Sequence, residues 1–504
     1  MSARTTRQTS VWVDTGPQPD ARPRLETNVD ADVAVLGGGM VGITTAVLLQ
    51  EAGARVVLLE AGRLAGGVSG YTTAKVSSQH GLVYARLRSR FGRDGAATYG
   101  AANQAALEWM AARVEHDGIE CDWRRRPSYA YLTEDRAKAE QEAEAAIEAG
   151  LPASLVEETG LPYHVAAAVR FEDQAEFHVR KYLLALGASL TEVYERSHAV
   201  DVDVNGRCAV KTPGGRVTAD RVVVATHYPF LDRALAFPRV HPQRSYALVC
   251  SIDGEPPPGM YISGDSPTRS IRAVPVGGKD KLLVGGEGHH VGEGGDTEER
   301  YAALEAFARK HWAVRSVDYR WSSQDNTTID TLPYVGRLTP FGDKLLMATG
   351  FAKWGMTGGT AAALILADAL TGRENAWASL FDPNRLKPRA SAVRFVEENA
   401  KVGLHMVGDR LRHRGTRPIE DLAPGEGDIV RWGGEKVAGH RRDDGTLVAV
   451  SPTCAHLGCQ VSWNRAERSW DCPCHGSRFS PDGDVLHGPA VHRLEHKPLP
   501  REGT

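Results

Sequence analysis

Residues 32–60, DVAVLGGGMVGITTAVLLQEAGARVVLLE, decide the fold of the larger part of this chain. The apolar run at residues 33–36 is typical of a buried parallel strand. A glycine-rich turn and a helical pattern follow it, and a second apolar run occupies residues 56–59. Strand, turn, helix and strand in this order predict a βαβ unit with a parallel sheet that carries helices on its faces.

The glycines of the turn form the pattern G-x-G-x-x-G. Gly37 permits the tight turn, Gly39 lets a pyrophosphate approach the backbone, and Gly42 lets the helix pack closely on the strand. Glu60 ends the second strand, where a carboxylate accepts hydrogen bonds from ribose hydroxyls. The unit predicts a dinucleotide cofactor, and by itself it does not distinguish FAD from NAD.

Two later segments bear on that choice. Residues 219–226, ADRVVVAT, indicate another buried strand, and residues 350–359, GFAKWGMTGG, precede a helical run. With residues 32–60 they resemble the D-amino-acid oxidase and glycine oxidase family of FAD enzymes over roughly residues 30–375. The resemblance implies that the late glycine segment and the positive end of its helix hold the flavin ring. The expected FAD contacts are Gly37, Gly39, Gly42, Glu60, Thr72, Thr73, Gly350, Gly355, Met356 and Thr357.

Near the C-terminal end the chain reads C-A-H-L-G-C from Cys454 and C-P-C-H-G-S from Cys472. Two thiolates and two imidazoles in the order C-x-H and C-x-x-H suit a 2Fe–2S cluster with two Cys on one iron and two His on the other. A Cys2His2 zinc site uses the same atoms, but zinc fingers place two cysteines before two histidines. The pairing of one Cys with one His in each half favours the cluster.

About ninety residues at this end resemble the Rieske iron–sulfur family. By this resemblance Cys454 and Cys472 bind one iron, His456 and His475 bind the other, and Cys459 and Cys474 form a disulfide between the two cluster loops. Replacing two thiolates by neutral imidazoles raises the reduction potential, into roughly the −150 to +300 mV range.

The surroundings of the cluster can also be interpreted through this resemblance. Ser477 and Phe479 occupy positions where high-potential members carry hydroxyls that donate to cluster sulfurs. Ser477 keeps its donor and Phe479 has none, so we expect a lower potential than that of the cytochrome bc-complex proteins. Gly488-Pro489-Ala490 matches the family's proline loop, which covers the cluster; an ordinary turn is the alternative interpretation.

A flavin domain followed by a Rieske domain also resembles bacterial fusion proteins with this order. We therefore expect an α/β FAD-binding (Rossmann-like) domain with an α+β substrate domain, plus a C-terminal all-β Rieske domain. The expected boundaries are 1–30 for a disordered or extended tail, 31–384 for the oxidoreductase domain, 385–415 for a helical connector and 416–504 for the Rieske domain. The FAD-binding parts are expected at about 31–90, 219–230 and 325–375.

Residue patterns between these motifs predict further elements. Helices are expected at 96–115, 137–149 and 360–370, and strands at 128–132, 246–252, 282–287, 428–432 and 446–450.

The sequence also offers four candidates for catalytic residues. Arg272 is a candidate to bind a substrate carboxylate bidentately, and a structural strand arginine is the alternative. Lys353 and Lys75 lie within motifs expected near the flavin ring. Tyr246 is a candidate wall of the substrate site, with a role in the core as the alternative.

Three more residues lie in or near these motifs. Sarcosine-oxidase-like members carry a lysine two places after the last glycine of the flavin segment, where this chain has Thr357, which weakens an amino-acid substrate. Trp354 is a second candidate pocket wall, or a core residue. His80 is a remote candidate for a covalent flavin link.

Composition bounds the class of protein. With 504 residues and a net charge of −3, the chain is long enough for two or three domains and shows no basic character that indicates nucleic acid. We expect no membrane span and no signal peptide, because no run approaches the roughly 18 apolar residues that a span needs. Cys121, Cys208 and Cys250 are scattered and expected to be reduced, which indicates a cytoplasmic protein in which a disulfide is unusual.

These observations predict an FAD- and 2Fe–2S-containing dehydrogenase. It would oxidise a small organic substrate, such as an amine or amino-acid-like C–N bond, and pass electrons through the cluster to a redox partner protein or another acceptor. Reductive flow from a partner to the flavin, and an electron-transfer module without its own substrate, are the alternatives. An oxygenase would need a mononuclear iron triad, which the sequence does not present.

Overall fold

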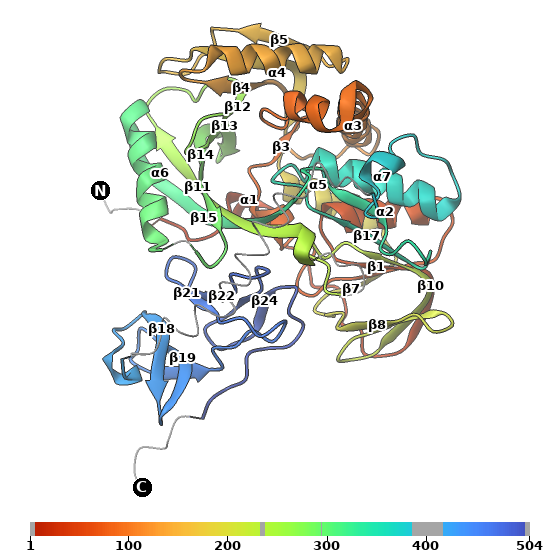
Figure 1. Cartoon of the computed structure of the whole chain (residues 1–504), viewed down its shortest axis with the longest axis vertical. Coiled ribbons are helices and arrows are strands. Elements are labelled where there is room, and N and C mark those ends of the chain that lie inside the picture. The colour runs from red at the N-terminus through yellow and green to blue at the C-terminus, as the bar shows by residue number, and fades with distance from the viewer. Residues whose placement is uncertain (1–5, 232–236, 294, 386–416, 499–504) are drawn as a thin grey trace.

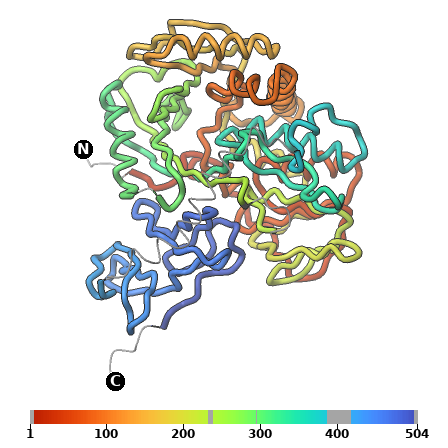
Figure 2. The backbone as a smooth tube through the Cα atoms, viewed as in Figure 1, coloured from red at the N-terminus to blue at the C-terminus, as the bar shows by residue number. Residues whose placement is uncertain are grey.

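The computed structural model describes residues 6–231, 237–293, 295–385 and 417–498 of the chain. Three parts are visible in Figures 1 and 2: a sheet with helices beside it, a second large sheet, and a smaller β-rich part at the C-terminal end. The first two parts interleave along the sequence, and the third is continuous.

A parallel sheet forms the core of the first part, extended at one edge by antiparallel strands. Its strand order is β16-β17-β10-β1-β2-β7, and β9 and β8 pair beyond β10. The bounds are β1 (Val29–Leu36), β2 (Val56–Leu59), β7 (Glu192–Tyr194), β8 (Asp201–Asp203), β9 (Cys208–Lys211), β10 (Arg216–Val224), β16 (Tyr334–Arg337) and β17 (Leu345–Thr349). Helices α2 (Met40–Glu51), α5 (Val179–Leu186), α7 (Thr357–Thr371) and α8 (Ala378–Phe381) belong to this part. The βαβ unit predicted from residues 32–60 is confirmed.

The second sheet is long and mainly antiparallel, in the order β15-β11-β14-β13-β12-β4-β6-β3, with β5 paired to β6. Its bounds are β3 (Lys75–Val76), β4 (Arg124–Leu132), β5 (Ala153–Val156), β6 (Ala167–Glu176), β11 (Val240–Ile252), β12 (Met260–Ser263), β13 (Arg269–Val276), β14 (Lys279–His290) and β15 (Val314–Thr328). Helices α3 (Tyr84–His116), α4 (Arg136–Glu148) and α6 (Glu298–His311) pack against it or beside it. The helices and strands expected in this region are confirmed, although β15 carries residues 325–328 into this sheet and out of the FAD-binding part.

The C-terminal part consists of two small antiparallel sheets, β18-β19-β20 and β21-β22-β23-β24. Their bounds are β18 (Gly427–Trp432), β19 (Glu435–Arg441), β20 (Leu447–Val450), β21 (Ser462–Asn464), β22 (Ser469–Asp471), β23 (Arg478–Phe479) and β24 (Val485–His487). This part packs against α6, through the Thr297–Asn464 and Tyr301–Glu467 hydrogen bonds, and against β15 and β11, through the Gln324–Gly476 hydrogen bond and the Arg244–Asp471 ion pair. The all-β character expected from the sequence is confirmed.

The N-terminal segment corrects one expectation. Residues 1–5 lie outside the described residues. The tail was expected to be disordered or extended; residues 6–30 include helix α1, and residues 17–28 contain no helix or strand and are mostly exposed. Helix α1 (Val11–Thr15) buries Val11 and Trp12, and the Trp12 side chain is only 1 % exposed. Trp12 Nε1 donates to the carbonyl oxygen of Thr72 at 2.7 Å. The apolar Val-Trp-Val sequence between polar neighbours was the available signal for this burial.

Two other expectations concern the connector and the possibility of a membrane-spanning helix. Residues 386–416, which contain almost all of the expected connector, lie outside the described residues. Within the described ranges, every helix is too short or too polar to cross a lipid bilayer.

Trp12→Ala should destabilise the oxidoreductase part. Loss of a buried Trp side chain costs about 3–5 kcal/mol, since it removes apolar contacts and leaves a cavity. We expect a lower Tm in differential scanning calorimetry. Phe341→Ala is the control, because Phe341 is 99 % exposed and its truncation should change Tm little. An equal Tm for Trp12→Ala and the wild type would contradict the structural role of α1.

Candidate functional site

A cavity of about 700 Å³ lies where all three parts of the chain meet. The ends of β1, β2 and β10 form one end of it, and β11, β14 and the Thr72–Thr73 segment form another. Residues 485–491 of the C-terminal part complete its wall. A cavity of this size and shape, at the carboxyl ends of parallel strands, is where a doubly wound fold binds a nucleotide.

The backbone geometry at the first turn suits a pyrophosphate. Gly37 has φ +109°, and a Cβ there would lie 2.4 Å from the carbonyl oxygen of Ala225. A Cβ on Gly42 would lie 1.8 Å from the carbonyl oxygen of Gly37, so helix α2 can lie this close to the turn only because residue 42 is glycine. Gly37 and Gly39 line the cavity, whereas Gly42 lies behind it in the packing position expected from the sequence.

Glu60 lies at the end of β2 and lines the cavity. Its two carboxylate oxygens accept hydrogen bonds from the backbone N–H groups of Gly38 at 2.6 Å and Gly62 at 2.7 Å. Burial raises the pKa of the Glu60 carboxyl, which the two N–H donors oppose. These bonds fix the carboxylate beside the glycine turn, where it would meet the ribose of a bound dinucleotide.

The six residues expected to contact the flavin ring fall into two groups. Thr72, Thr73, Gly355 and Met356 line the cavity. The other two, Gly350 and Thr357, lie behind the wall.

The segment that carries Thr72 and Thr73 is held from behind by two indole groups. Trp12 Nε1 donates to the Thr72 carbonyl, and Trp321 Nε1 donates to the Tyr71 carbonyl at 2.9 Å. Thr357 begins α7, and its hydroxyl donates to the Ser77 carbonyl at 2.7 Å. The glycine-walled cavity and these fixed segments fit an FAD molecule.

Lys75 is the catalytic candidate with the most distinctive surroundings. It lines the cavity, and its side chain is buried. Its Nζ donates to the carbonyl oxygen of Tyr261 and to Ser270 Oγ at 2.7 Å. Burial, together with the positive charge of Arg272, lowers the pKa of Lys75 to about 7. A lysine of this kind is poised to accept a proton at neutral pH.

Lys353 and Tyr246 also line the cavity. The Lys353 side chain is surrounded by protein, which lowers its pKa, yet its surface remains accessible from the open cavity. Its backbone N–H donates to the Asp325 carboxylate. The Tyr246 hydroxyl donates to His289 Nε2 at 2.9 Å, and the Tyr246 ring forms part of the wall. Trp354 lines the cavity too and stacks on His80.

The structure places Arg272 elsewhere, and its interpretation as a carboxylate clamp was wrong. The guanidinium is 1 % exposed, and its Nε lies 3.1 Å from Glu176 Oε2. It also donates to the carbonyl oxygens of Thr73, at 3.0 Å, and Ala74. Arg272 therefore neutralises a buried carboxylate and supports the Thr73–Ala74 backbone, as a strand arginine does.

His80 is likewise engaged in the protein interior. Its Nε2 donates to the Ser77 carbonyl at 2.8 Å, and its Nδ1 accepts from the Tyr99 hydroxyl. Burial lowers its pKa to about 3. With both ring nitrogens engaged, His80 holds Ser77 and α7 in place.

The four predicted cluster ligands converge on two adjacent loops of the C-terminal part. The thiols of Cys454 and Cys472 are within hydrogen-bonding distance, which lowers the pKa of Cys454 to about 7 and raises that of Cys472. The rings of His456 and His475 are 5.2 Å apart between centroids. Two thiols facing each other beside two imidazoles fit a 2Fe–2S cluster.

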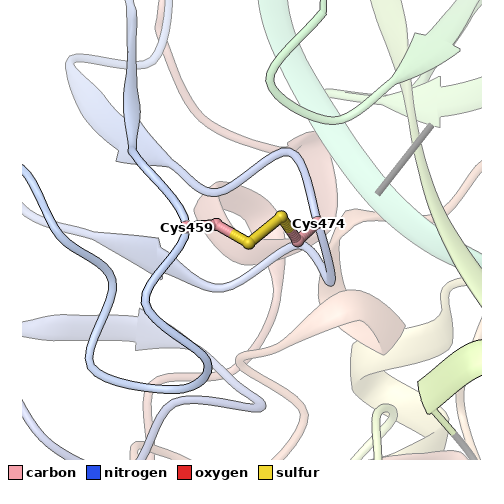
Figure 3. Close-up of a disulfide and its surroundings, with 2 residues drawn as sticks. All are labelled: Cys459 and Cys474. Carbon is pink, nitrogen blue, oxygen red and sulfur yellow. A yellow bond between two sulfur atoms is a disulfide. The ribbon is translucent and has the colours of Figure 1, made fainter. Parts of the chain in front are cut away.

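Cys459 and Cys474 form a disulfide that joins the two loops, as Figure 3 shows. Ser477 Oγ hydrogen-bonds the Cys454 thiol and accepts from the backbone N–H of Ala490 at 3.0 Å. The loop at residues 488–490 is therefore tied to the cluster loops. Phe479 is fully buried beside them and offers no donor.

Three cavity residues that the sequence patterns did not single out lie together. Asp325 and His227 line the cavity from the oxidoreductase part, and His487 lines it from the C-terminal part. His227 Nδ1 lies 2.9 Å from His487 Nε2, and His227 Nε2 lies 3.4 Å from Asp325 Oδ1. Their positions next to quoted motifs were the only sequence signal, and nothing in the sequence places them in contact.

Two protein families match successive regions of the chain. Residues 32–369 match the sequence model of the FAD dependent oxidoreductase family, and residues 416–498 match that of the Rieske [2Fe-2S] domain. The putative Rieske 2Fe-2S iron-sulfur protein YhfW of Bacillus subtilis is 36 % identical over 481 residues, which are 94 % of each chain.

Two solved structures are similar to the oxidoreductase part in fold. Glycine oxidase from Geobacillus kaustophilus has a TM-score of 0.59 and 19 % identity, and covers 71 % of this chain and 99 % of its own. L-proline dehydrogenase from P. horikoshii has a TM-score of 0.60 and 17 % identity, and covers 71 % of this chain and 98 % of its own.

Hydrogen bonds to the cluster should set its potential. Ser477→Ala removes a hydroxyl donor and should lower the reduction potential, whereas Phe479→Tyr adds a hydroxyl near the cluster and should raise it. The measurement is a redox titration followed by the EPR signal of the reduced cluster. Unchanged potentials in both variants, with the cluster fully incorporated, would refute this assignment of the two side chains.

Proposed function

Because the chain belongs to the FAD dependent oxidoreductase family and carries a Rieske [2Fe-2S] domain, we propose that it oxidises a C–N bond and sends the electrons through the cluster to an external acceptor. The shared cavity wall is the observation that carries this proposal. Residues 485–491 of the Rieske domain line the same cavity as the glycine turn and the Thr72–Thr73 segment. An electron-transfer module with a separate role would not need its cluster domain to form part of the flavin cavity.

The bound cofactors would supply the redox chemistry, since FAD accepts a hydride and the cluster carries electrons singly. The residues of this chain supply binding, orientation and proton transfer. Gly37, Gly39 and Glu60 would hold the dinucleotide, and Thr72 and Thr73 would face the flavin ring. The two solved structures of similar fold are titled as a glycine oxidase and an L-proline dehydrogenase, which supports an amine or amino acid as the substrate class.

Oxidation of an amine removes a hydride from carbon and a proton from nitrogen. Lys75 is the residue best suited to take that proton, because it is buried in the cavity wall and its pKa is lowered to about 7. Its Nζ is oriented by Ser270 and by the Tyr261 carbonyl. Tyr246 and Trp354 would wall the space in which the substrate lies.

The two histidine ligands expected for the cluster differ in exposure. His475 is 5 % exposed, and its ring centroid lies 6.4 Å from that of Tyr228 in the oxidoreductase domain. His456 is half-buried between the exposed residues Ala455 and Leu457. An external acceptor would take electrons at the His456 side, and a redox protein is a suitable acceptor because this edge is open.

Anaerobic reduction tests the proposed function directly. Purified protein is mixed with panels of secondary amines and amino acids, and flavin absorbance is followed together with the cluster EPR signal. We expect flavin bleaching first and cluster reduction second, because the electrons enter at the flavin. If no substrate in the panels bleaches the flavin but a reduced partner protein reduces the cluster and then the flavin, electrons flow in the opposite direction and the proposal fails.

The pH dependence tests Lys75. Only neutral Lys75 accepts a proton, so the rate of flavin reduction should rise with pH, reach half its maximum near pH 7 and level off above it. Lys75→Met should lower the rate by about 10²-fold or more and abolish this inflection. Lys279→Met is the control, since Lys279 is exposed on β14. A Lys75→Met enzyme with the wild-type pH profile would exclude Lys75 as the base.

A further inference from the structure

Residues 487–490 of the Rieske domain, which include the proline loop, contact both the cluster loops and the flavin cavity. On one side, the N–H of Ala490 binds Ser477, whose hydroxyl contacts the cluster ligand Cys454. On the other side, His487 lines the flavin cavity and meets His227. The strand that carries His487, β24, pairs with β23, which directly follows the second cluster loop. The short stretch of backbone at residues 487–490 therefore connects the cavity wall to Ser477, which contacts the cluster ligand Cys454.

Asp325 orients the contact between the two histidines. It is a carboxylate and only accepts, so Nε2 of His227 donates to it. The other ring nitrogen of His227, Nδ1, therefore faces His487 Nε2, and one hydrogen bond joins the two rings across the domain boundary. Asn326 Nδ2 lies 3.0 Å from the His227 carbonyl and holds the same segment. Burial lowers the pKa of His487 well below its usual value, in keeping with a neutral ring that shares this bond.

The segment that carries His227 also approaches the cluster. Tyr228 follows it in sequence, and the Tyr228 ring lies 6.4 Å from the ring of the ligand His475. His227 itself has φ +63°, a conformation that few residues other than glycine adopt. The turn after β10 thus places one residue against the flavin cavity and the next against a cluster ligand.

The domains are held closely enough to keep this geometry. Gln324 Nε2 donates to the Gly476 carbonyl at 2.9 Å, and a Cβ on Gly476 would lie 2.5 Å from that nitrogen. Arg244 on β11 is fully buried, with its Nε 3.8 Å from Asp471 Oδ2, one residue before the ligand Cys472. Arg244 and Asp471 are opposite charges buried in the seam between the domains, and removal of either one would leave the other buried without its partner.

From this geometry we propose that the hydrogen bond between His227 and His487 positions the Rieske loop as a wall of the flavin cavity and sets the rate of electron transfer between the flavin and the cluster. His487 and His227 are positioning residues in this proposal. It rests on the proposed function only in requiring that both cofactors are present, and it holds for either direction of electron flow.

The test starts from the flavin without a substrate. The holoprotein is illuminated anaerobically with EDTA as the electron donor, which reduces the bound FAD, and the growth of the cluster EPR signal is timed. His487→Ala and His227→Ala should each slow cluster reduction by at least tenfold and change the visible circular dichroism of the flavin. The EPR line shape of the cluster should stay that of the wild type, because neither residue is a ligand.

A double-mutant cycle separates this role from general damage. Both single variants remove the same bond, so the double variant should be no slower than either single variant. His496→Ala is the matched control, an exposed histidine of the same domain, and it should behave as the wild type. If His487→Ala fails to incorporate the cluster, His227→Ala decides by itself, because it lies outside the Rieske domain.

Two results would overturn the proposal. One is wild-type timing of cluster reduction in His227→Ala with an intact cluster. The other is a double variant whose slowing equals the product of the two single effects. The proposed function fails in a different way, namely when no organic substrate bleaches the flavin while light-driven transfer to the cluster remains fast.

Discussion

The architecture depends on a close approach of the Rieske domain to the oxidoreductase domain at Gly476. The backbone of the second cluster loop lies against the side chains of Pro242 on β11 and Gln324 on β15, and a Cβ on Gly476 would lie 2.5 Å from each of them. Only glycine fits here, so this contact holds the second cluster loop against the second sheet. It also brings the proline loop into the wall of the flavin cavity, so that the two sites share a boundary.

The ion pair and the histidine pair at this boundary lie at different places. Arg244 and Asp471 anchor the seam with buried charge, whereas His227 and His487 meet at the cavity wall. Lys75 is buried on another side of the same cavity, where loss of solvation lowers its pKa toward neutrality. If Lys75 is the base of the proposed reaction, proton acceptance and electron exit take place at separate walls of the cavity.

Much of the fold was predictable from sequence because its signals are local. The strand-turn-helix pattern at residues 32–60 needs glycine wherever backbone approaches backbone, and the structure requires it at Gly37 and Gly42. Expectations failed where the outcome depended on distant partners. Trp12 is buried because it meets Thr72, and Arg272 serves Glu176 and not the cavity; neither partner is near in sequence.

The sequence alone determined which cofactors the chain is built for, since the spacing of glycines and of Cys–His pairs reflects ligand geometry within a few residues. It also determined the order of the domains along the chain. Only the tertiary structure decided which of the cavity residues lie together, that His487 meets His227 across a domain boundary, and that His475 is buried whereas His456 is partly exposed. The physical reason is that contacts between residues hundreds of positions apart depend on how preformed units pack, and local sequence carries no record of that packing.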